Sequence, residues 1–258
     1  MRLFGLVGYP VAQSQSPAFF HQLFEKEGIV DAEYRLSPLK DIRFLPELMA
    51  ENPDWVGFNV THPHKQAVMS YMDSLTREAD EVGAVNTVLV MRENGKVRLV
   101  GHNTDGAGFA CLLREACPQL PRAALVLGTG GAAKAVFNVL KNNEIETAFV
   151  SRQPEKGDYT YNELTPSIIQ RYNLIINATP LGMACDTRYP NIPYSSITQQ
   201  HTLIDLVYNP VVTPFMQKGR ERAARVFNGL TMLHEQALAS WKFWNGGGEC
   251  LFPFSCNK

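Results

Sequence analysis

The chain has 258 residues, which is enough for two modest domains that each bury a core. Its 24 basic and 25 acidic residues nearly cancel without forming blocks of like charge, which argues against a nucleic-acid partner and favours a small molecule. No apolar run approaches the roughly 18 residues of a membrane helix, and glycines interrupt the start before a signal-peptide core could form, so we expect a cytoplasmic protein with no membrane partner.

The first hundred residues alternate short apolar runs with helical stretches, a pattern typical of an α/β domain. A strand is predicted at residues 2–7, and a helix then begins with Ser16 as N-cap and Pro17 at the first helical position, and ends at Gly28. Further strands are predicted at 32–36, 55–60, 85–91 and 97–100. Asn94-Gly95 between the last two is a hairpin signal.

A second α/β unit is predicted after Asp105. It comprises helices at 107–115 and 131–141 and strands at 123–127, 147–150, 174–176 and 203–206, and a final helix is predicted after it at 231–243. From Gly246 onward we expect irregular coil. The fold class is therefore α/β: an N-terminal α/β domain plus a Rossmann-type domain with a doubly wound parallel sheet, in which ligands bind at the carboxyl ends of the strands.

A glycine-rich turn follows the predicted strand at 123–127. Gly128, Gly130 and Ala133 match the dinucleotide-binding pattern G-x-G-x-x-[G/A] between a strand and a helix. There the first glycine permits a tight turn, the second lets a pyrophosphate approach the backbone, and the small third residue lets the helix pack on the strand. The alternative is a glycine-rich turn without a ligand.

The end of the next strand favours NADP over NAD. An NAD enzyme usually carries an acidic residue here, but this chain has Ser151-Arg152, with Lys156 close behind. A guanidinium suits a 2′-phosphate, since arginine offers two parallel N–H groups to phosphate oxygens. The alternative is a solvated surface pair of arginine and lysine.

Polar clusters after the predicted strands contain a proton donor and a carboxylate. Lys65 is the donor, since a free lysine is almost wholly protonated at neutral pH, and Asp105 could orient its ammonium group. Taken singly, Lys65 could instead be a solvated loop lysine, and Asp105 an Asx-turn or helix cap.

The cysteines and histidines predict no metal site. Five cysteines are an odd number without C-x-x-C spacing, so we expect free thiols. His62 and His64 are separated by Pro63 and have no acidic or cysteine ligand nearby. We expect both to be exposed residues that flank the lysine, although either could add a titration near neutral pH.

With these motifs the chain resembles the shikimate dehydrogenase family. The blocks that carry the resemblance are collinear and span nearly the whole chain. They are Gly8-Tyr9-Pro10, Ser14-Gln15-Ser16-Pro17, Gly57-Phe58-Asn59-Val60-Thr61-His62-Pro63-His64-Lys65, Gly83-Ala84-Val85-Asn86-Thr87, Gly101-His102-Asn103-Thr104-Asp105-Gly106, the glycine-rich turn, Asn177-Ala178-Thr179-Pro180-Leu181-Gly182-Met183, Asp205-Leu206-Val207-Tyr208-Asn209-Pro210, and Asn228-Gly229-Leu230 on to Gln236.

The resemblance implies the reversible NADPH-linked reduction of 3-dehydroshikimate to shikimate, in aromatic amino acid biosynthesis. It implies that Lys65 is the general acid and base and that Asp105 orients it. The residues implied to bind the substrate are Ser14, Ser16, Thr61, Asn86, Asp105, Tyr208 and Gln236. Those implied to bind NADP are Gly128, Thr129, Gly130, Gly131, Ala132, Ser151, Arg152, Leu206 and Gly229. Many relatives have asparagine and threonine around the arginine, where this chain has Ser151 and Gln153.

The expected organisation is a discontinuous substrate-binding catalytic domain, residues 1–105 and 232–258, around an NADP-binding domain at 106–231, in a monomer or homodimer. One alternative is a quinate/shikimate dehydrogenase with broader alcohol and cofactor use. Another is a non-catalytic NADP-binding sensor of the same fold. Lys65 and Asp105 argue against the sensor, because a pure binder needs no proton donor.

Overall fold

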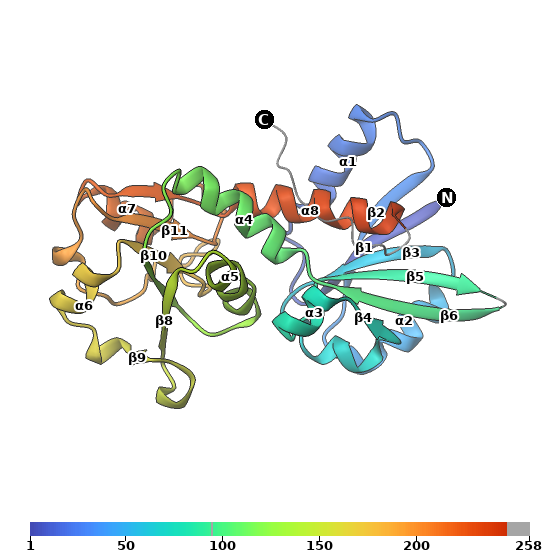
Figure 1. Ribbon diagram of the computed structural model, residues 1–258. Helices are drawn as coiled ribbons and strands as arrows, with labels where there is room; N and C mark the ends of the chain where they lie inside the picture. Colours follow the sequence, from blue (N-terminus) through green and yellow to red (C-terminus); the bar gives the residue numbers. More distant parts are fainter. Residues whose placement is uncertain (94, 247–258) are drawn as a thin grey trace. The chain divides into compact units, whose positions relative to one another are not determined.

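The computed structural model describes residues 1–93 and 95–246, and it shows helices and strands mixed along the chain (Figure 1). The chain divides into two compact units. Unit 1 joins Met1–Thr104 to the chain from Gln236 onward, and unit 2 is Asp105–Glu235. The bounds of the substrate-binding and NADP-binding domains stay a prediction.

Unit 1 contains a six-stranded mixed sheet in the order β2-β1-β3-β5-β6-β4. Strand β1 is parallel to β2 and β3, whereas β5 is antiparallel to β3 and β6. Its elements are β1 (Arg2–Gly8), α1 (Ser16–Lys26), β2 (Ala32–Pro38), α2 (Leu45–Glu51), β3 (Trp55–Val60), β4 (Ser74–Leu75), α3 (Arg77–Val82), β5 (Thr87–Glu93) and β6 (Lys96–His102), together with most of α8 (Leu230–Asn245).

Helix α8 packs on this sheet through aromatic side chains. The Trp244 ring lies 4.8 Å from the Phe4 ring between centroids, and its indole N–H donates to the Val88 carbonyl at 3.0 Å. Gly57 provides the space, because a Cβ there would lie 2.4 Å from the Trp244 ring. A side chain at position 57 would therefore push α8 away from the sheet.

Unit 2 contains a six-stranded sheet in the order β12-β11-β10-β7-β8-β9, and all its pairs are parallel. The elements are α4 (Asp105–Ala116), β7 (Ala123–Leu127), α5 (Gly131–Asn142), β8 (Glu146–Ser151), β9 (Tyr159–Thr160), α6 (Pro166–Arg171), β10 (Leu174–Asn177), β11 (Thr202–Asp205), α7 (Pro214–Arg220), β12 (Arg225–Phe227) and the first residues of α8.

Two apolar clusters cover the faces of this parallel sheet. On one face Phe109 of α4 and Val136 of α5 pack with Val126 of β7, and on the other Ile169 of α6 and Phe215 of α7 pack with neighbouring strand residues. Helices on both faces of a parallel sheet are the doubly wound arrangement. The predicted α/β fold class with a Rossmann-type unit is confirmed.

Several local predictions need correction. The N-cap of α1 is Gln15 rather than Ser16, which is already the first helical residue. The strand predicted to begin at Val85 begins at Thr87, because the amides of Val85 and Asn86 donate to Lys65 and His102 instead of entering the ladder with β3. The sequence reading also omitted the short elements α2, α3, α6, α7, β4, β9 and β12.

The predicted hairpin is confirmed, since β5 and β6 pair as far as Glu93 and Lys96. Asn94 of its turn and the predicted coil from 247 to 258 lie outside the described residues. Within the described part of the chain, no helix is both long and apolar enough to cross a membrane.

Candidate functional site

A buried row of polar side chains runs through unit 1 at the ends of its strands. Its centre is Ser240 of α8, whose hydroxyl lies 2.9 Å from Asn59 Nδ2, 2.8 Å from Thr87 Oγ1 and 3.2 Å from Thr104 Oγ1. Ser240 also donates to the Gln236 carbonyl at 2.9 Å. One hydroxyl thus joins α8 to the ends of β3, β5 and β6.

The Asn86 amide is fixed at one end of this row. Its oxygen accepts from the Thr104 amide at 2.8 Å and from the Thr87 hydroxyl at 3.0 Å, and its nitrogen lies 3.0 Å from Thr104 Oγ1. The Gln236 side chain reaches Thr104 Oγ1 at 3.4 Å. Two expected substrate residues, Asn86 and Gln236, therefore share Thr104 as a partner.

Ser14 and Ser16 lie at the other end of the row. The two hydroxyls are 3.2 Å apart, and Ser14 Oγ accepts the Ser16 amide, a role at the start of α1 that the sequence assigned to Ser16. Tyr34 bridges them to the rest, because its hydroxyl contacts Ser16 and donates to Asn59 Oδ1 at 2.9 Å. Unit 1 thus brings together four expected substrate residues, Ser14, Ser16, Asn86 and Gln236.

The lysine loop follows β3 directly. The Thr61 amide donates to the Val7 carbonyl, and the Lys65 carbonyl accepts the Val85 amide at 2.7 Å, which sets the half-buried Lys65 beside the chain that leads into Asn86. His62 is exposed, as expected. His64 is not exposed: it is buried, and its Nε2 lies 2.7 Å from the carbonyl of Leu39, a residue of another segment.

Asp105 and Tyr208 belong to unit 2. Asp105 is buried, directly follows Thr104 and is the first residue of α4. Tyr208 follows β11 and is half-buried.

His102 ends β6 beside this polar row. Its ring stacks on Phe243 with centroids 4.5 Å apart, and its Nδ1 lies 2.8 Å from the Thr76 hydroxyl. Burial lowers the pKa of His102 to about 4, although the Glu78 carboxylate, 3.7 Å away, acts in the opposite direction. His102 is therefore neutral at physiological pH.

The lowered pKa of His102 predicts a loss of stability in acid. An unfolded histidine has a pKa near about 6.5, so between about pH 6.5 and pH 4 the unfolded chain binds this proton more readily than the folded chain. The free energy of unfolding should fall by about 3 kcal/mol through that window on account of His102. His102→Gln should remove this contribution, which urea unfolding at several pH values would measure.

The prediction is tested by the difference in unfolding free energy between His102→Gln and wild type at each pH. Burial raises the pKa of Asp205 to about 6, so this carboxyl makes stability fall as pH rises through the same window, with the opposite sign. Because Asp205 is present in both proteins, its effect cancels in the difference. Unfolding free energies that depend on pH equally in both proteins would contradict the assignment to His102.

The glycine-rich turn of unit 2 has the geometry of a phosphate-binding loop. Gly128 has φ of +102°, which favours glycine, and its amide donates to the Val150 carbonyl. Gly130 is the N-cap of α5, where no side chain caps the helix and no acidic residue occupies the first turn. A Cβ at Gly130 would meet no atom within 4 Å. Backbone N–H groups at this end of α5 can therefore receive an anion.

Two basic side chains follow β8, the neighbour of β7. Arg152 and Lys156 are exposed, and neither forms a salt bridge with the residues that the structure describes. Ser151 is buried, and its hydroxyl accepts the Gln153 amide at 3.1 Å, which shapes the turn that carries Arg152. The two positive charges are available to a ligand phosphate.

Two further expected cofactor residues approach each other closely at the ends of β11 and β12. A Cβ on Gly229 would lie 2.1 Å from the Leu206 carbonyl oxygen, so only glycine allows this approach. The Gly229 amide donates to the Val207 carbonyl at 3.2 Å. The residues of unit 2 thus fit NADP, with glycines and a helix N-terminus for the pyrophosphate and Arg152 with Lys156 for a 2′-phosphate.

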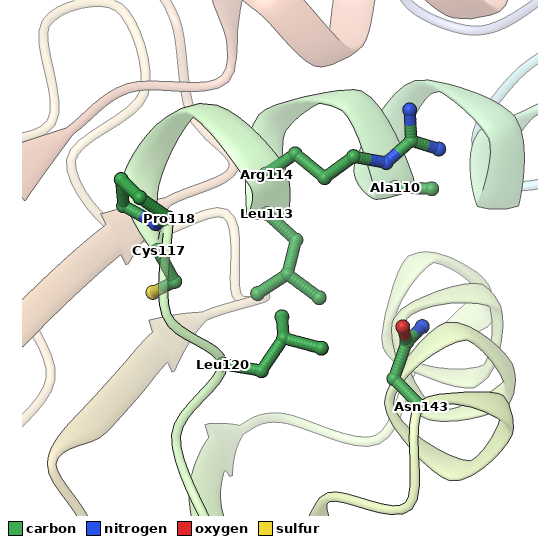
Figure 2. Close-up of a pocket in the computed structure, with 7 residues that line it drawn as sticks. All are labelled: Ala110, Leu113, Arg114, Cys117, Pro118, Leu120 and Asn143. Atoms are coloured by element: carbon green, nitrogen blue, oxygen red, sulfur yellow. The ribbon is translucent and has the colours of Figure 1, made fainter. Parts of the chain in front are cut away.

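A groove of about 470 Å³ in unit 2 lies away from these residues. It is lined by Ala110, Leu113, Arg114, Cys117, Pro118, Leu120 and Asn143, and the side chains of Leu113 and Leu120 approach each other within it (Figure 2). Asn143 follows the C-terminal end of α5, about 18 Å along the helix from the glycine-rich turn. The groove is therefore separate from the dinucleotide loop.

Sequence reasoning assigned no role to Ser240 or to Asp205. Ser240 had a weak signal, since it lies one helical turn after Gln236 on the same side of α8. Asp205 appeared only as part of a motif. Among the described residues, no group of three or more histidine, cysteine, aspartate or glutamate side chains could hold a metal ion.

Comparison with known proteins finds relatives that are similar over nearly the whole chain. Residues 6–88 match the model of the shikimate dehydrogenase substrate-binding domain. The NADP⁺ shikimate dehydrogenase of Desulforamulus reducens is 33% identical over 94% of this chain and 89% of its own, and that of Shouchella clausii is 34% identical over 95% and 93%. The structure of Thermus thermophilus shikimate 5-dehydrogenase with NADP(H) and shikimate has 31% identity and a TM-score of 0.82, covering 95% of this chain and 94% of that one.

Proposed function

Because the chain belongs to the shikimate dehydrogenase family, we propose that it catalyses the reversible NADPH-linked reduction of 3-dehydroshikimate to shikimate, a step of aromatic amino acid biosynthesis. The observation that carries the proposal is the buried polar row of unit 1. It presents hydroxyl and amide groups from Ser14 to Gln236, a set suited to a small ring with one carboxylate and several hydroxyls.

Ser14 and Ser16 hold the substrate carboxylate in this proposal. Their hydroxyls are 3.2 Å apart at the start of α1, where the backbone amides of the helix also favour a negative charge. Tyr208 of unit 2 is proposed as a further substrate-binding residue. The substrate hydroxyls are bound by Thr61, Asn86, Asp105 and Gln236.

Lys65 serves as the general acid in the reductive direction and as the general base in the oxidative one. Its ammonium group donates a proton to the alkoxide that develops at C3, and Asp105 orients the ammonium group. The network around Asn86 supports this role, because the Val85 amide holds the Lys65 carbonyl and so limits the movement of the lysine loop. NADPH supplies the hydride when it is bound.

Unit 2 holds the cofactor. The turn from Gly128 to Ala132 receives the pyrophosphate, while Ser151 and Arg152 select the 2′-phosphate, with Lys156 adding charge. Leu206 and Gly229 border the rest of the cofactor. The assignment of substrate binding to unit 1 and of cofactor binding to unit 2 rests on these residue sets. It rests also on the match of residues 6–88 to the substrate-binding domain.

A matrix of steady-state rates tests the proposal. Shikimate and quinate are each oxidised with NADP and with NAD, and the proposal predicts the highest kcat/KM for shikimate with NADP. Comparable rates with quinate or with NAD would favour a quinate/shikimate dehydrogenase of broader use. NADP binding with no turnover of either alcohol would identify a sensor and contradict the proposed activity.

A further inference from the structure

Asp205 is a fully buried carboxylate at the end of β11, and it contacts three separate segments of unit 2. Its Oδ1 accepts from Asn177 Nδ2 at 2.9 Å and from the Val207 amide at 3.0 Å. Its Oδ2 accepts from the Thr213 hydroxyl at 2.5 Å. These donors belong to the end of β10, to the chain after β11 and to the start of α7.

The contact with Asn177 extends to the glycine-rich turn. Because Asp205 receives the amide nitrogen of Asn177, the amide oxygen faces the other way, where it accepts the Thr179 amide at 3.1 Å and the Thr179 hydroxyl at 2.6 Å. Thr179 in turn packs on Gly128, since a Cβ at Gly128 would lie 2.9 Å from the Thr179 methyl carbon. The orientation of the buried Asn177 amide therefore determines the position of Thr179 against the glycine-rich turn.

The contact with Val207 extends to the other side of the cofactor residues. By holding the Val207 amide, Asp205 fixes the turn that presents the Leu206 carbonyl to Gly229. The Val207 carbonyl then accepts the Gly229 amide. Asp205 is thus linked to Gly128 through the side chains of Asn177 and Thr179, and to Gly229 through the backbone of Val207. Asp205 itself is fully buried.

Burial disfavours the ionised form of Asp205, and the hydrogen bonds that the carboxylate accepts offset this effect only in part. Burial raises the pKa of Asp205 to about 6, whereas the hydrogen bonds from Thr213, Val207 and Asn177 act to lower it. An ionised carboxylate is acceptor-only, so it can serve all three donors at once. A neutral side chain of the same shape could accept on one side only.

We propose that Asp205 is the positioning residue of the cofactor site: by orienting the Asn177 amide it holds Thr179 against Gly128, and so it sets the glycine-rich turn in the form that receives the NADP pyrophosphate. The inference rests on the proposed function of unit 2. In this inference Asp205 does not contact the cofactor but acts on the cofactor site through Asn177 and Thr179.

Three variants test the inference by calorimetric titration with NADP and by steady-state kinetics. Asp205→Ala should raise both the Kd and the KM for NADP about tenfold, because the Asn177 amide loses its fixed partner, while the KM for shikimate changes less than about threefold. Asp205→Asn should bring the Kd back to within about threefold of wild type, since its oxygen can still accept from Asn177. Thr179→Val keeps the shape beside Gly128 and the backbone N–H bond to Asn177, but it removes the hydroxyl bond to Asn177, and it should weaken NADP binding in the same direction.

Ile169→Ala serves as the matched control, because it removes a buried side chain of α6 from the same unit without touching the Asp205 contacts. It should lower the melting temperature while leaving the Kd for NADP unchanged. If Asp205→Ala does not fold, Thr179→Val decides the question by its Kd for NADP, while Asp205→Asn is expected to stay within about threefold of wild type. An Asp205→Ala or Thr179→Val variant that melts earlier but binds NADP as wild type does would overturn the inference. Wild type that failed to bind NADP would instead overturn the proposed function.

Discussion

Lys65→Ala is expected to lower kcat for shikimate oxidation by a factor on the order of 10² or more, with little change in the KM for shikimate. A positioned acid acts mainly on the transition state, in which charge develops on the substrate oxygen, so its removal affects turnover more than binding. The Lys65 backbone carbonyl still accepts the Val85 amide in the variant, and the loop should keep its form. Steady-state kinetics with saturating NADP would measure the effect.

Lys96→Ala provides the control for this experiment. Lys96 is an exposed lysine at the start of β6 in the same unit, so the same change of charge occurs there without a role in the reaction. Its kcat should equal that of wild type. Unchanged kcat in the Lys65 variant would remove this lysine from the chemistry, even if the chain proved to be an active dehydrogenase.

Arg152→Ala is expected to lower kcat/KM for NADP by roughly 10- to 100-fold while leaving kcat/KM for NAD almost unchanged. Arg152 has no carboxylate partner among the described residues, so its removal breaks no salt bridge there and should not destabilise unit 2. A 2′-phosphate would lose the charge-assisted hydrogen bonds that a guanidinium offers, and NAD carries no such phosphate. The ratio of the two kcat/KM values is the measurement.

Arg122→Ala is the matched control for Arg152. Arg122 is also exposed, but it precedes β7 at the amino end of the parallel strands, whereas the expected cofactor residues follow the carboxyl ends. In Arg122→Ala the ratio of kcat/KM for NADP to kcat/KM for NAD should equal that of wild type. An Arg152 variant that weakens both cofactors equally would show a general electrostatic effect, and one that weakens neither would leave the selection to Lys156 or Ser151.

The sequence was most informative where chemistry and secondary structure coincide. Gly128 and Gly130 between a buried strand and an alanine-rich helix predicted the dinucleotide turn, and the structure has β7 ending at Leu127 and α5 beginning at Gly131. The hairpin of β5 and β6 was equally clear from its turn residues. In both places a special backbone conformation restricts the residue type, and the restriction is visible in one sequence.

Short helices were missed because periodicity needs length. Helices α6 and α7 have six and seven residues, too few for an apolar repeat, although each begins with a signal that sequence alone could supply. Thr165-Pro166 and Thr213-Pro214 each combine a side-chain N-cap with a proline in the first turn.

The supporting residues of the site could not be predicted for a different reason. Ser240 meets Asn59 and Thr87 across more than 150 positions of sequence, and Asp205 meets Asn177 from a neighbouring strand. Such contacts depend on register and on helix rotation, which composition and spacing do not determine. His64 differs from expectation for the same cause, because Leu39 comes from another segment.

The most direct test of the account is the reductive reaction itself. Purified protein is incubated with NADPH and 3-dehydroshikimate, and the shikimate formed is quantified against the NADPH consumed. Equal amounts of shikimate and consumed NADPH are expected, with the rate lost in Lys65→Ala and kept in Lys96→Ala. NADPH that is not consumed, or that is consumed without the formation of shikimate, would contradict the account.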